Sequence, residues 1–283
     1  MGFLVGILNG LIVSFQNNQF KRLSGFESYF LNGWRFIAGS LILFVLISIF
    51  SLWSIPPNIV FLFVALSLPV EFMGANLYVK AFQYSPQSLI GPLFSLAVLF
   101  LVPLQYITLG ELPNLLGAMG IVLGLVGSFF LGWDIKNPGV RESLKNIFRE
   151  KGSYYILGAA FFASLAVVLA KMSYQYAHPL VVGFFIITGL AILHLPFAFR
   201  NIGTFPRLSV APFAKMNFAY GMAMTLHYVG LSLLPAAYYI SIKRSSILFD
   251  VLLGKLIYNE SHFGGRLIGA LIMIAGLVLI AIA

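Results

Sequence analysis

Long apolar stretches separated by short polar breaks run through almost the whole chain. A helix needs about 20 mainly apolar residues to cross the hydrocarbon core of a bilayer. We predict ten such spans, at about residues 3–19, 28–50, 58–82, 86–108, 112–132, 153–173, 179–199, 211–233, 235–257 and 264–282. The first lacks a basic leader and a small-residue cleavage site, so we interpret it as a span rather than a signal peptide.

The longest polar stretch divides the chain. It suggests a first unit of residues 1–131, a connecting loop of residues 132–152 and a second unit of residues 153–283, with five spans in each unit. Apolar residues at helical spacing within the loop suit a short amphipathic helix on the membrane surface. A solvated linker is an equally good interpretation.

The two units contain matching residues at a constant spacing. Three pairs are 149 positions apart: Leu77 and Leu226, Pro86 and Pro235, and Glu111 and Glu260. Because each unit has an odd number of spans, the second enters the membrane from the opposite side. The pattern predicts an all-α integral membrane protein in which two inverted five-helix repeats surround a central cavity, as in many secondary transporters.

Three groups of residues carry a family resemblance. They are Trp34-Arg35-Phe36, residues 75–82 with Leu109-Gly110-Glu111, and residues 242–249 with Tyr258-Asn259-Glu260. In this order and spacing they resemble the drug/metabolite transporter superfamily, in its EamA-like branch. The resemblance covers nearly the whole chain and implies a ten-helix carrier. It leaves the substrate open, because members handle amino acids, nucleotide sugars, sugar phosphates and drugs.

The composition mainly excludes classes of protein and kinds of site. Charged residues make up 9% of the chain, against roughly 25% in soluble domains, so lipid must be part of the solvent. The chain has no cysteine and four scattered histidines. With no metal-ligand, nucleotide-binding or nucleophile–base motif, we expect no metal, no cofactor and no enzymatic activity.

The net charge of +9 reflects basic loops rather than a nucleic-acid partner. Lysine and arginine gather in the loops that follow odd-numbered spans: Lys21, Arg22, the 136–151 cluster, Arg200, Arg207 and Arg266. The positive-inside rule places these loops in the cytoplasm and both termini outside. Relatives in the superfamily are generally drawn with cytoplasmic termini, which is the opposite orientation. We favour the orientation that the loop charges indicate, because they belong to this sequence. We expect a multi-pass monomer or homodimer in the cell membrane.

The ninth span carries the strongest indication of a polar site. Four of its residues share one face of a continuous helix: Tyr239, Lys243, Ser246 and Asp250. Arg244 is rotated from Lys243 by about 100°. A Lys-Arg pair in this span is similar to the phosphate-gripping pair of the plastid phosphate-translocator branch, and it suits a carboxylate or phosphate. Alternatively, Lys243 forms a salt bridge with Asp250 or Glu71 and Arg244 snorkels.

Glu71 lies deep in the third span. An ionisable side chain in the hydrocarbon region costs about 2.5–3.5 kcal/mol on insertion scales, so it usually faces a cavity or a partner. A buried carboxyl holds a proton more readily, which suits proton coupling. The alternative, which we favour, is a pair with Arg35 that joins the second and third spans. Asn76 lies on another face of the third span.

The repeat also relates residues of the third and eighth spans. His227 and Tyr228 correspond to Tyr78 and Val79 under the 149-residue shift. Positions related in this way flank a central cavity, so we expect His227, Tyr228 and Tyr78 to line it. An interhelical hydrogen bond is the more usual role of a membrane histidine. Trp34 either stacks on a substrate or sits in the interfacial aromatic belt.

These features together predict a secondary active transporter, an exporter or exchanger, that moves a small polar metabolite by alternating access. Its substrate carries a carboxylate or a phosphate; an amino acid or a related compound is the example we expect. We expect substrate contacts from Lys243, Arg244, His227, Tyr228, Tyr239, Asn76, Tyr78 and Trp34. Proton coupling or ion pairing falls to Glu71, Arg35 and Asp250. The alternative function is a proton-coupled exporter of cationic drugs, with Glu71 or Asp250 as the acidic anchor.

Overall fold

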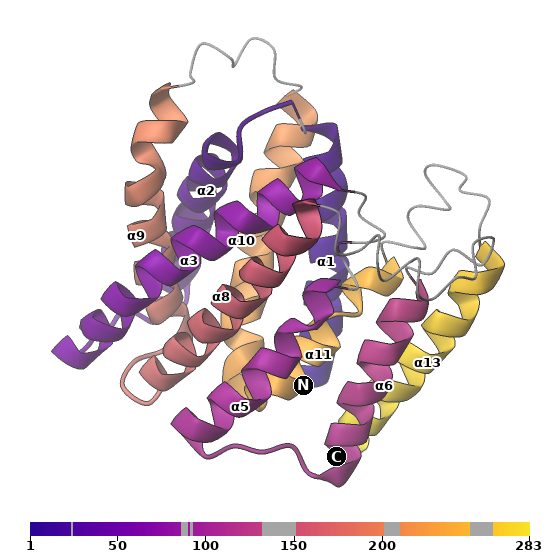
Figure 1. Cartoon of the computed structure of the whole chain (residues 1–283). Coiled ribbons are helices and arrows are strands. Elements are labelled where there is room, and N and C mark those ends of the chain that lie inside the picture. The colour runs from indigo at the N-terminus through magenta and orange to yellow at the C-terminus, as the bar shows by residue number, and fades with distance from the viewer. Residues whose placement is uncertain (24, 86–89, 91–92, 132–150, 201–209, 250–262) are drawn as a thin grey trace.

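The computed structural model in Figure 1 describes residues 1–23, 25–85, 90, 93–131, 151–200, 210–249 and 263–283. These residues form helices and no strand. The helices are α1 (Gly2–Arg22), α2 (Ser28–Ile49), α3 (Asn58–Tyr84), α5 (Ala97–Leu109), α6 (Leu115–Leu131), α8 (Lys151–Ser173), α9 (Pro179–Arg200), α10 (Val210–Leu233), α11 (Ala236–Lys243) and α13 (Phe263–Ile282). The all-α prediction is confirmed.

Most predicted spans agree with the observed helices to within a few residues. By length and apolarity, α2, α3, α8 and α9 could each cross a membrane, and shorter apolar helices cover Leu93–Leu109, Leu115–Phe130 and Leu271–Ile282. Local chemistry sets several ends. Pro179 opens α9, where its missing N–H costs nothing. Gly110 closes α5 at φ 69°, a left-handed conformation that glycine adopts without strain.

Two predicted spans differ from the structure. The regular helix α5 begins at Ala97, well after the predicted start at residue 86, and residues 86–89 lie outside the described chain. The predicted span 235–257 is not one continuous helix, because α11 ends at Lys243 and a turn occupies residues 244–245. The predicted amphipathic helix of the connecting loop also lies outside the described residues.

Helices pair across the two halves of the chain, and the pairing is symmetric. Helix α1 packs on α10, and its counterpart α8 packs on α3, the counterpart of α10. The central helices α2 and α9 pack on each other, and so do the last helices of the halves, α6 and α13. Exchanging the halves leaves these contacts unchanged. In Figure 1, α1 rises from the end of the bundle that holds both termini, whereas α8 descends toward it, so the repeats are inverted.

Two three-helix groups follow from these contacts. Group 1 contains α1, α10 and α11, and group 2 contains α8, α3 and α5. The α2–α9 pair joins them, because α2 contacts α10 and α9 contacts α3. The functional cavity lies between the two groups.

The α6–α13 pair relies on glycine. A Cβ added at Gly120 would lie 2.7 Å from the carbonyl oxygen of Gly276, and one at Gly127 would lie 2.6 Å from the amide nitrogen of Met273. Small residues of this kind allow close helix approach in membranes. Gly120 and Gly124 have GxxxG spacing, and a Cβ at Gly276 would lie 2.7 Å from the amide nitrogen of Gly124, so this spacing serves contact within one chain.

Candidate functional site

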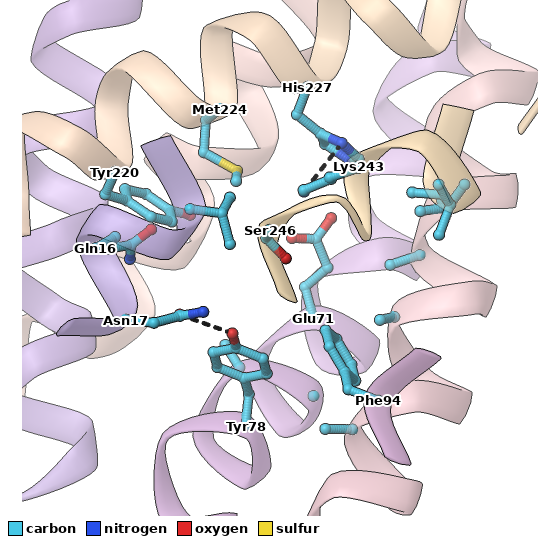
Figure 2. Close-up of a pocket in the computed structure, with 18 of the residues that line it drawn as sticks. Gln16, Asn17, Glu71, Tyr78, Phe94, Tyr220, Met224, His227, Lys243 and Ser246 are labelled. Atoms are coloured by element: carbon cyan, nitrogen blue, oxygen red, sulfur yellow. Dashed lines mark hydrogen bonds between the residues drawn. The ribbon is translucent and has the colours of Figure 1, made fainter. Parts of the chain in front are cut away.

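A cavity of about 210 Å³ lies between group 1 and group 2. This volume is just below the range of about 300–1,000 Å³ that holds drug-sized ligands, so it suits a small metabolite. Its walls come from α1, α3, α8, α10, α11 and residues beside them, with α2 adding Arg35 and Phe36. Figure 2 shows the side chains of both groups pointing into this space.

An interruption in the last helix of group 1 brings two cations to the cavity. The amide of Ser245 donates to the carbonyl of Ile242 at 2.9 Å, a tighter bond than the α-helical one. The backbone therefore turns after Lys243, and both Lys243 and Arg244 line the cavity despite their predicted separation around a regular helix. Gly10 of α1 makes room for this turn, because a Cβ there would lie 2.9 Å from the amide nitrogen of Ser246.

The same tightened turn occurs in group 2 at the position related by the repeat. The amide of Leu96 donates to the carbonyl of Leu93 at 3.1 Å, and Leu93 and Leu96 are 149 positions before Ile242 and Ser245. Both halves therefore break this helix at the level of the cavity. Such broken helices are typical of midplane binding sites in carriers, because irregular backbone is tolerated where it lines a cavity.

The nearest contacts of the two cations of group 1 are with aromatic rings. The Lys243 Nζ lies 3.4 Å from His227 Nδ1, and the Arg244 guanidinium carbon lies 4.1 Å from the centre of the Phe94 ring. Within the described part of the chain, no carboxylate oxygen lies within 4.0 Å of either cation, and the Nε of Arg244 has no hydrogen-bond partner. Both groups can therefore meet an anion that enters the cavity.

Group 2 supplies a carboxylate and an apolar wall. Glu71 of α3 points into the cavity on the side that faces Lys243 and Ser246 (Figure 2). Helix α8 contributes only small apolar residues: Ala159, Ala163, Ala166, Val167 and Ala170. A ligand with an apolar part can lie against this face, because the α8 side chains include no polar group that the ligand would desolvate.

Arg35 lines the cavity, and the structure brings it to other partners than the one we predicted. Its Nη1 donates to Asn32 Oδ1 at 2.9 Å. Its guanidinium carbon lies 4.4 Å from the centre of the Tyr220 ring and 4.8 Å from that of Phe20. No ion pair joins it to Glu71 among the described residues. The favoured Arg35–Glu71 pair is therefore not formed in this conformation.

Three of the predicted binding residues line the cavity from the positions expected. Tyr78, His227 and Tyr228 all contribute to its wall. The Tyr78 hydroxyl donates to Asn17 Oδ1 at 2.9 Å, which links group 2 to group 1. Lys243, Arg244, Glu71 and Arg35 complete the set of predicted site residues that the structure brings together.

Other predicted site residues lie behind the wall. The Tyr239 hydroxyl meets the Asn9 amide at 2.5 Å and donates to the Leu226 carbonyl at 3.1 Å. Asn76 accepts from Asn32 at 3.0 Å and lies 3.0 Å from His194 Nε2, so it ties α3 to α2 and α9. Their place is one of support for the wall rather than contact with a ligand.

Trp34 lies outside the cavity wall, and Asp250 cannot be compared with the wall because it is outside the described residues. The ring of Trp34 packs edge-on against Phe199, at 5.9 Å between centroids, and Phe213, at 6.1 Å.

Sequence reasoning missed Asn17, Phe94 and the α8 alanines. Asn17 lies in a polar run near the end of the predicted first span, and we assigned it no role. Phe94 is 149 positions before Lys243, so a strict application of the repeat could have found it. The alanines carry no signal, because alanine is common throughout membrane helices. Across the described residues, no cluster of His, Asp or Glu could hold a metal ion.

Comparison with known proteins agrees with this architecture. The model of the EamA-like transporter family matches residues 1–133 and again residues 150–282. No curated protein matches the chain. A solved crystal structure, described only as that of a protein, superposes with a TM-score of 0.73 at 17% identity and covers 99% of this chain and 98% of its own. That likeness concerns the fold. Because the family model covers nearly the whole chain in two repeats, the protein belongs to the EamA-like transporter family of the drug/metabolite transporter superfamily and is a membrane transporter.

Proposed function

We propose that this transporter is a secondary active carrier of a small polar metabolite that bears a carboxylate or phosphate. One observation carries the proposal: the ammonium of Lys243 and the guanidinium of Arg244 reach the same cavity, and no carboxylate oxygen of the described residues lies within 4.0 Å of either cation. Two cations held close together in a site of low dielectric favour a bound anion. Arginine offers a planar fork and lysine a mobile charge, a combination that suits an oxyanion.

The polar residues around these cations set the rest of the binding site. Gln16, Asn17 and Tyr78 supply amide and hydroxyl groups, and Ser246 supplies a second hydroxyl. The opposite face is the apolar wall of α8. We therefore expect a substrate with an anionic group, at least one further hydrogen-bonding group and a small apolar part.

Alternating access explains how such a site transports. Group 1 and group 2 are related by the inverted repeat, and they contact each other through α1 with α3 and through α11 with α5 and α8. If one group rocks against the other, the cavity opens first to one side of the membrane and then to the other. An anion that bridges Lys243 and the far wall draws the groups together.

A cation exporter is the second candidate, and it has its own observation. Glu71 is the one carboxylate among the described cavity residues, and it could hold a cation or a proton. Replacing Lys243 with alanine separates the candidates. The change should abolish transport of an anion, whereas transport of a cation should be spared or increased.

Purified protein in liposomes provides the direct test. Thermal-shift screening against amino acids, nucleotide sugars and phosphorylated metabolites should first identify a ligand. A ligand at 100 times its dissociation constant adds about 2.7 kcal/mol of stability. We expect uptake of that ligand to saturate and to rise when the same ligand is loaded inside. Flux that increases linearly with concentration and ignores internal substrate would contradict a carrier.

We also propose that both termini face away from the cytoplasm in a cell membrane. Exposed Arg22, Lys151 and Arg200 end or begin their helices at the end of the bundle opposite the termini (Figure 1). The positive-inside rule puts that end in the cytoplasm. A tag at the C-terminus should therefore be accessible from outside intact cells, and labelling only after the membrane is opened would reverse the assignment.

A further inference from the structure

A cluster of charged and polar contacts joins the two groups at the end that holds the termini. The Lys171 Nζ, at the end of α8 in group 2, lies 2.7 Å from Glu111 Oε2. It also donates to the carbonyl of Leu234 at 3.1 Å, just before α11 of group 1. Lysine therefore spans from the end of group 2 to the backbone of group 1. This is the only ion pair between side chains in the described part of the chain.

Gln105 makes the same connection through its buried amide. Its Nε2 donates to the carbonyl of Glu111 at 3.1 Å, and its Oε1 accepts from the amide of Ala237, in the first turn of α11, at 2.8 Å. The first backbone amides of a helix have no partner within the helix. Gln105 of group 2 thus satisfies one of the open donors of group 1.

Tyr238 extends the cluster to α6. Its hydroxyl accepts from the amide of Asn114 at 3.0 Å. The side chain of Asn114 in turn donates to the carbonyl of Ala283 at 2.7 Å. The α6–α13 pair is therefore tied to the same place.

We propose that Lys171, Glu111 and Gln105 form a latch that holds this end of the transport pathway closed, and that the latch must open in each transport cycle. This inference rests on the proposed carrier function and adds residues remote from the cavity to its cycle. Two of its bonds, from Lys171 to the Leu234 carbonyl and from the Ala237 amide to Gln105, cross between the two groups whose relative motion opens the cavity. They involve α8, α5 and α11, and both α8 and α11 also contribute residues to the cavity wall.

The chemistry of the latch suits a reversible contact. The side chain of Lys171 is 13% exposed and that of Glu111 is 34% exposed, so water reaches both when they separate. An ion pair of this kind contributes little to folding stability, about 0–1 kcal/mol. A bond to a charged donor still contributes enough to bias two conformations that differ by a few kcal/mol.

The closed end has a second layer that a latch would hold in place. Leu101, Val168, Leu231 and the start of α11 pack into one apolar cluster beside the cavity. Apolar packing in a membrane resists sliding weakly, because lipid can replace it. Directional bonds at the end of the cluster therefore fix the register of the two groups.

Site-directed labelling tests the latch without a substrate, so its result is independent of the proposed anion specificity. The chain has no cysteine, so a cysteine at Ile240 reports on the cavity alone. A membrane-impermeant maleimide is applied from the side of the termini. We expect Lys171→Met to increase the labelling rate about 10-fold, since a lost bond to a charged group corresponds to roughly one power of ten. Arg200→Met, at the opposite end, is the matched control and should leave the rate unchanged.

Reversible cross-linking tests the need for opening and covers the case in which Lys171→Met destabilises the fold. The pair Lys171→Cys with Leu234→Cys is bridged by a short bifunctional methanethiosulfonate, which joins group 2 to group 1. The pair Lys171→Cys with Glu111→Cys is the control, because both residues flank group 2. Transport should stop in the first pair, return after reduction, and continue in the control.

Each of the two experiments has an outcome that would contradict the latch. Equal labelling of the parent and the Lys171→Met variant would overturn the latch. So would full transport by the cross-linked Lys171–Leu234 variant. If neither cysteine-pair variant transports any tested anion before cross-linking but the labelling rate changes as expected, the proposed anion substrate is wrong and the closing role of the latch stands.

Discussion

The two three-helix groups share one backbone plan and carry opposite chemistry. At positions related by the 149-residue repeat, group 2 has Glu71, Tyr78 and Phe94 where group 1 has Tyr220, His227 and Lys243. All six side chains line the cavity. The repeat therefore fixes where the wall residues lie, and divergence of the two halves decides what they bind. The cations lie on one wall, and the carboxylate lies on the other.

This division has a consequence for transport. A symmetric cavity would bind a ligand equally well in two orientations. Two walls of different chemistry favour a single orientation of the ligand. The anionic end of a ligand is expected at group 1 and its apolar part at α8 of group 2. The following predictions test that division, beginning with the largest effect.

Removing the main cation should have the largest effect. Lys243→Ala deletes an ammonium that we expect to contact the anion directly, so binding should weaken by about 10- to 100-fold. Thermal-shift titration with the identified ligand measures this change. Lys80→Ala is the control, since Lys80 lies near the ring of Tyr29, at 5.3 Å, and not on the cavity wall. Equal losses in both variants would contradict a specific role for Lys243.

Filling the apolar wall should change size selection. Ala163→Leu adds a bulky side chain to the α8 face of the cavity. We expect affinity to fall about 10-fold for the largest anion that binds and to change little for the smallest, because overpacking costs about 1–3 kcal/mol. Competition between anions of increasing length measures the difference. Phe161→Leu is the control on the exposed side of α8, and a uniform loss across all lengths would exclude an apolar subsite.

Neutralising the carboxylate of group 2 should alter the response to pH. If Glu71 carries the coupled proton, uptake by the parent protein depends on pH and Glu71→Gln makes the rate nearly constant, because glutamine cannot titrate. Uptake by proteoliposomes over a series of buffers measures this. Glu27→Gln, on the N-terminal side of α2, is the control for a general loss of charge. A Glu71→Gln variant with the pH profile of the parent protein would rule out coupling through this residue.

Breaking the neutral bond between the walls should have the smallest effect. Tyr78→Phe removes one hydroxyl–amide hydrogen bond to Asn17, which is worth about 1 kcal/mol. We expect a change in affinity of roughly five-fold or less. Tyr84→Phe, on the exposed end of α3, should change nothing. A loss as large as that of Lys243→Ala would mean that the tyrosine, not the lysine, anchors the ligand.

Much of the architecture followed from local pattern. Runs of apolar residues of membrane-spanning length predicted the helices, because backbone groups in lipid must be satisfied within each helix. The constant spacing between the pairs of Pro86 with Pro235 and Glu111 with Glu260 predicted the repeat. A charged side chain in lipid has a high free-energy cost, and this predicted a polar site at Lys243, Arg244 and Glu71. All three line the cavity.

The sequence by itself determined the helices, their inverted repeat and the ionisable residues that need a polar space, since each depends on interactions within one segment or on the cost of contact with lipid. Only the tertiary structure decided the interruption after Lys243, the partners of Arg35, the support role of Asn76 and the contact between Lys171 and Leu234. These depend on which distant helices meet and at what depth. A pattern along one chain does not contain that information.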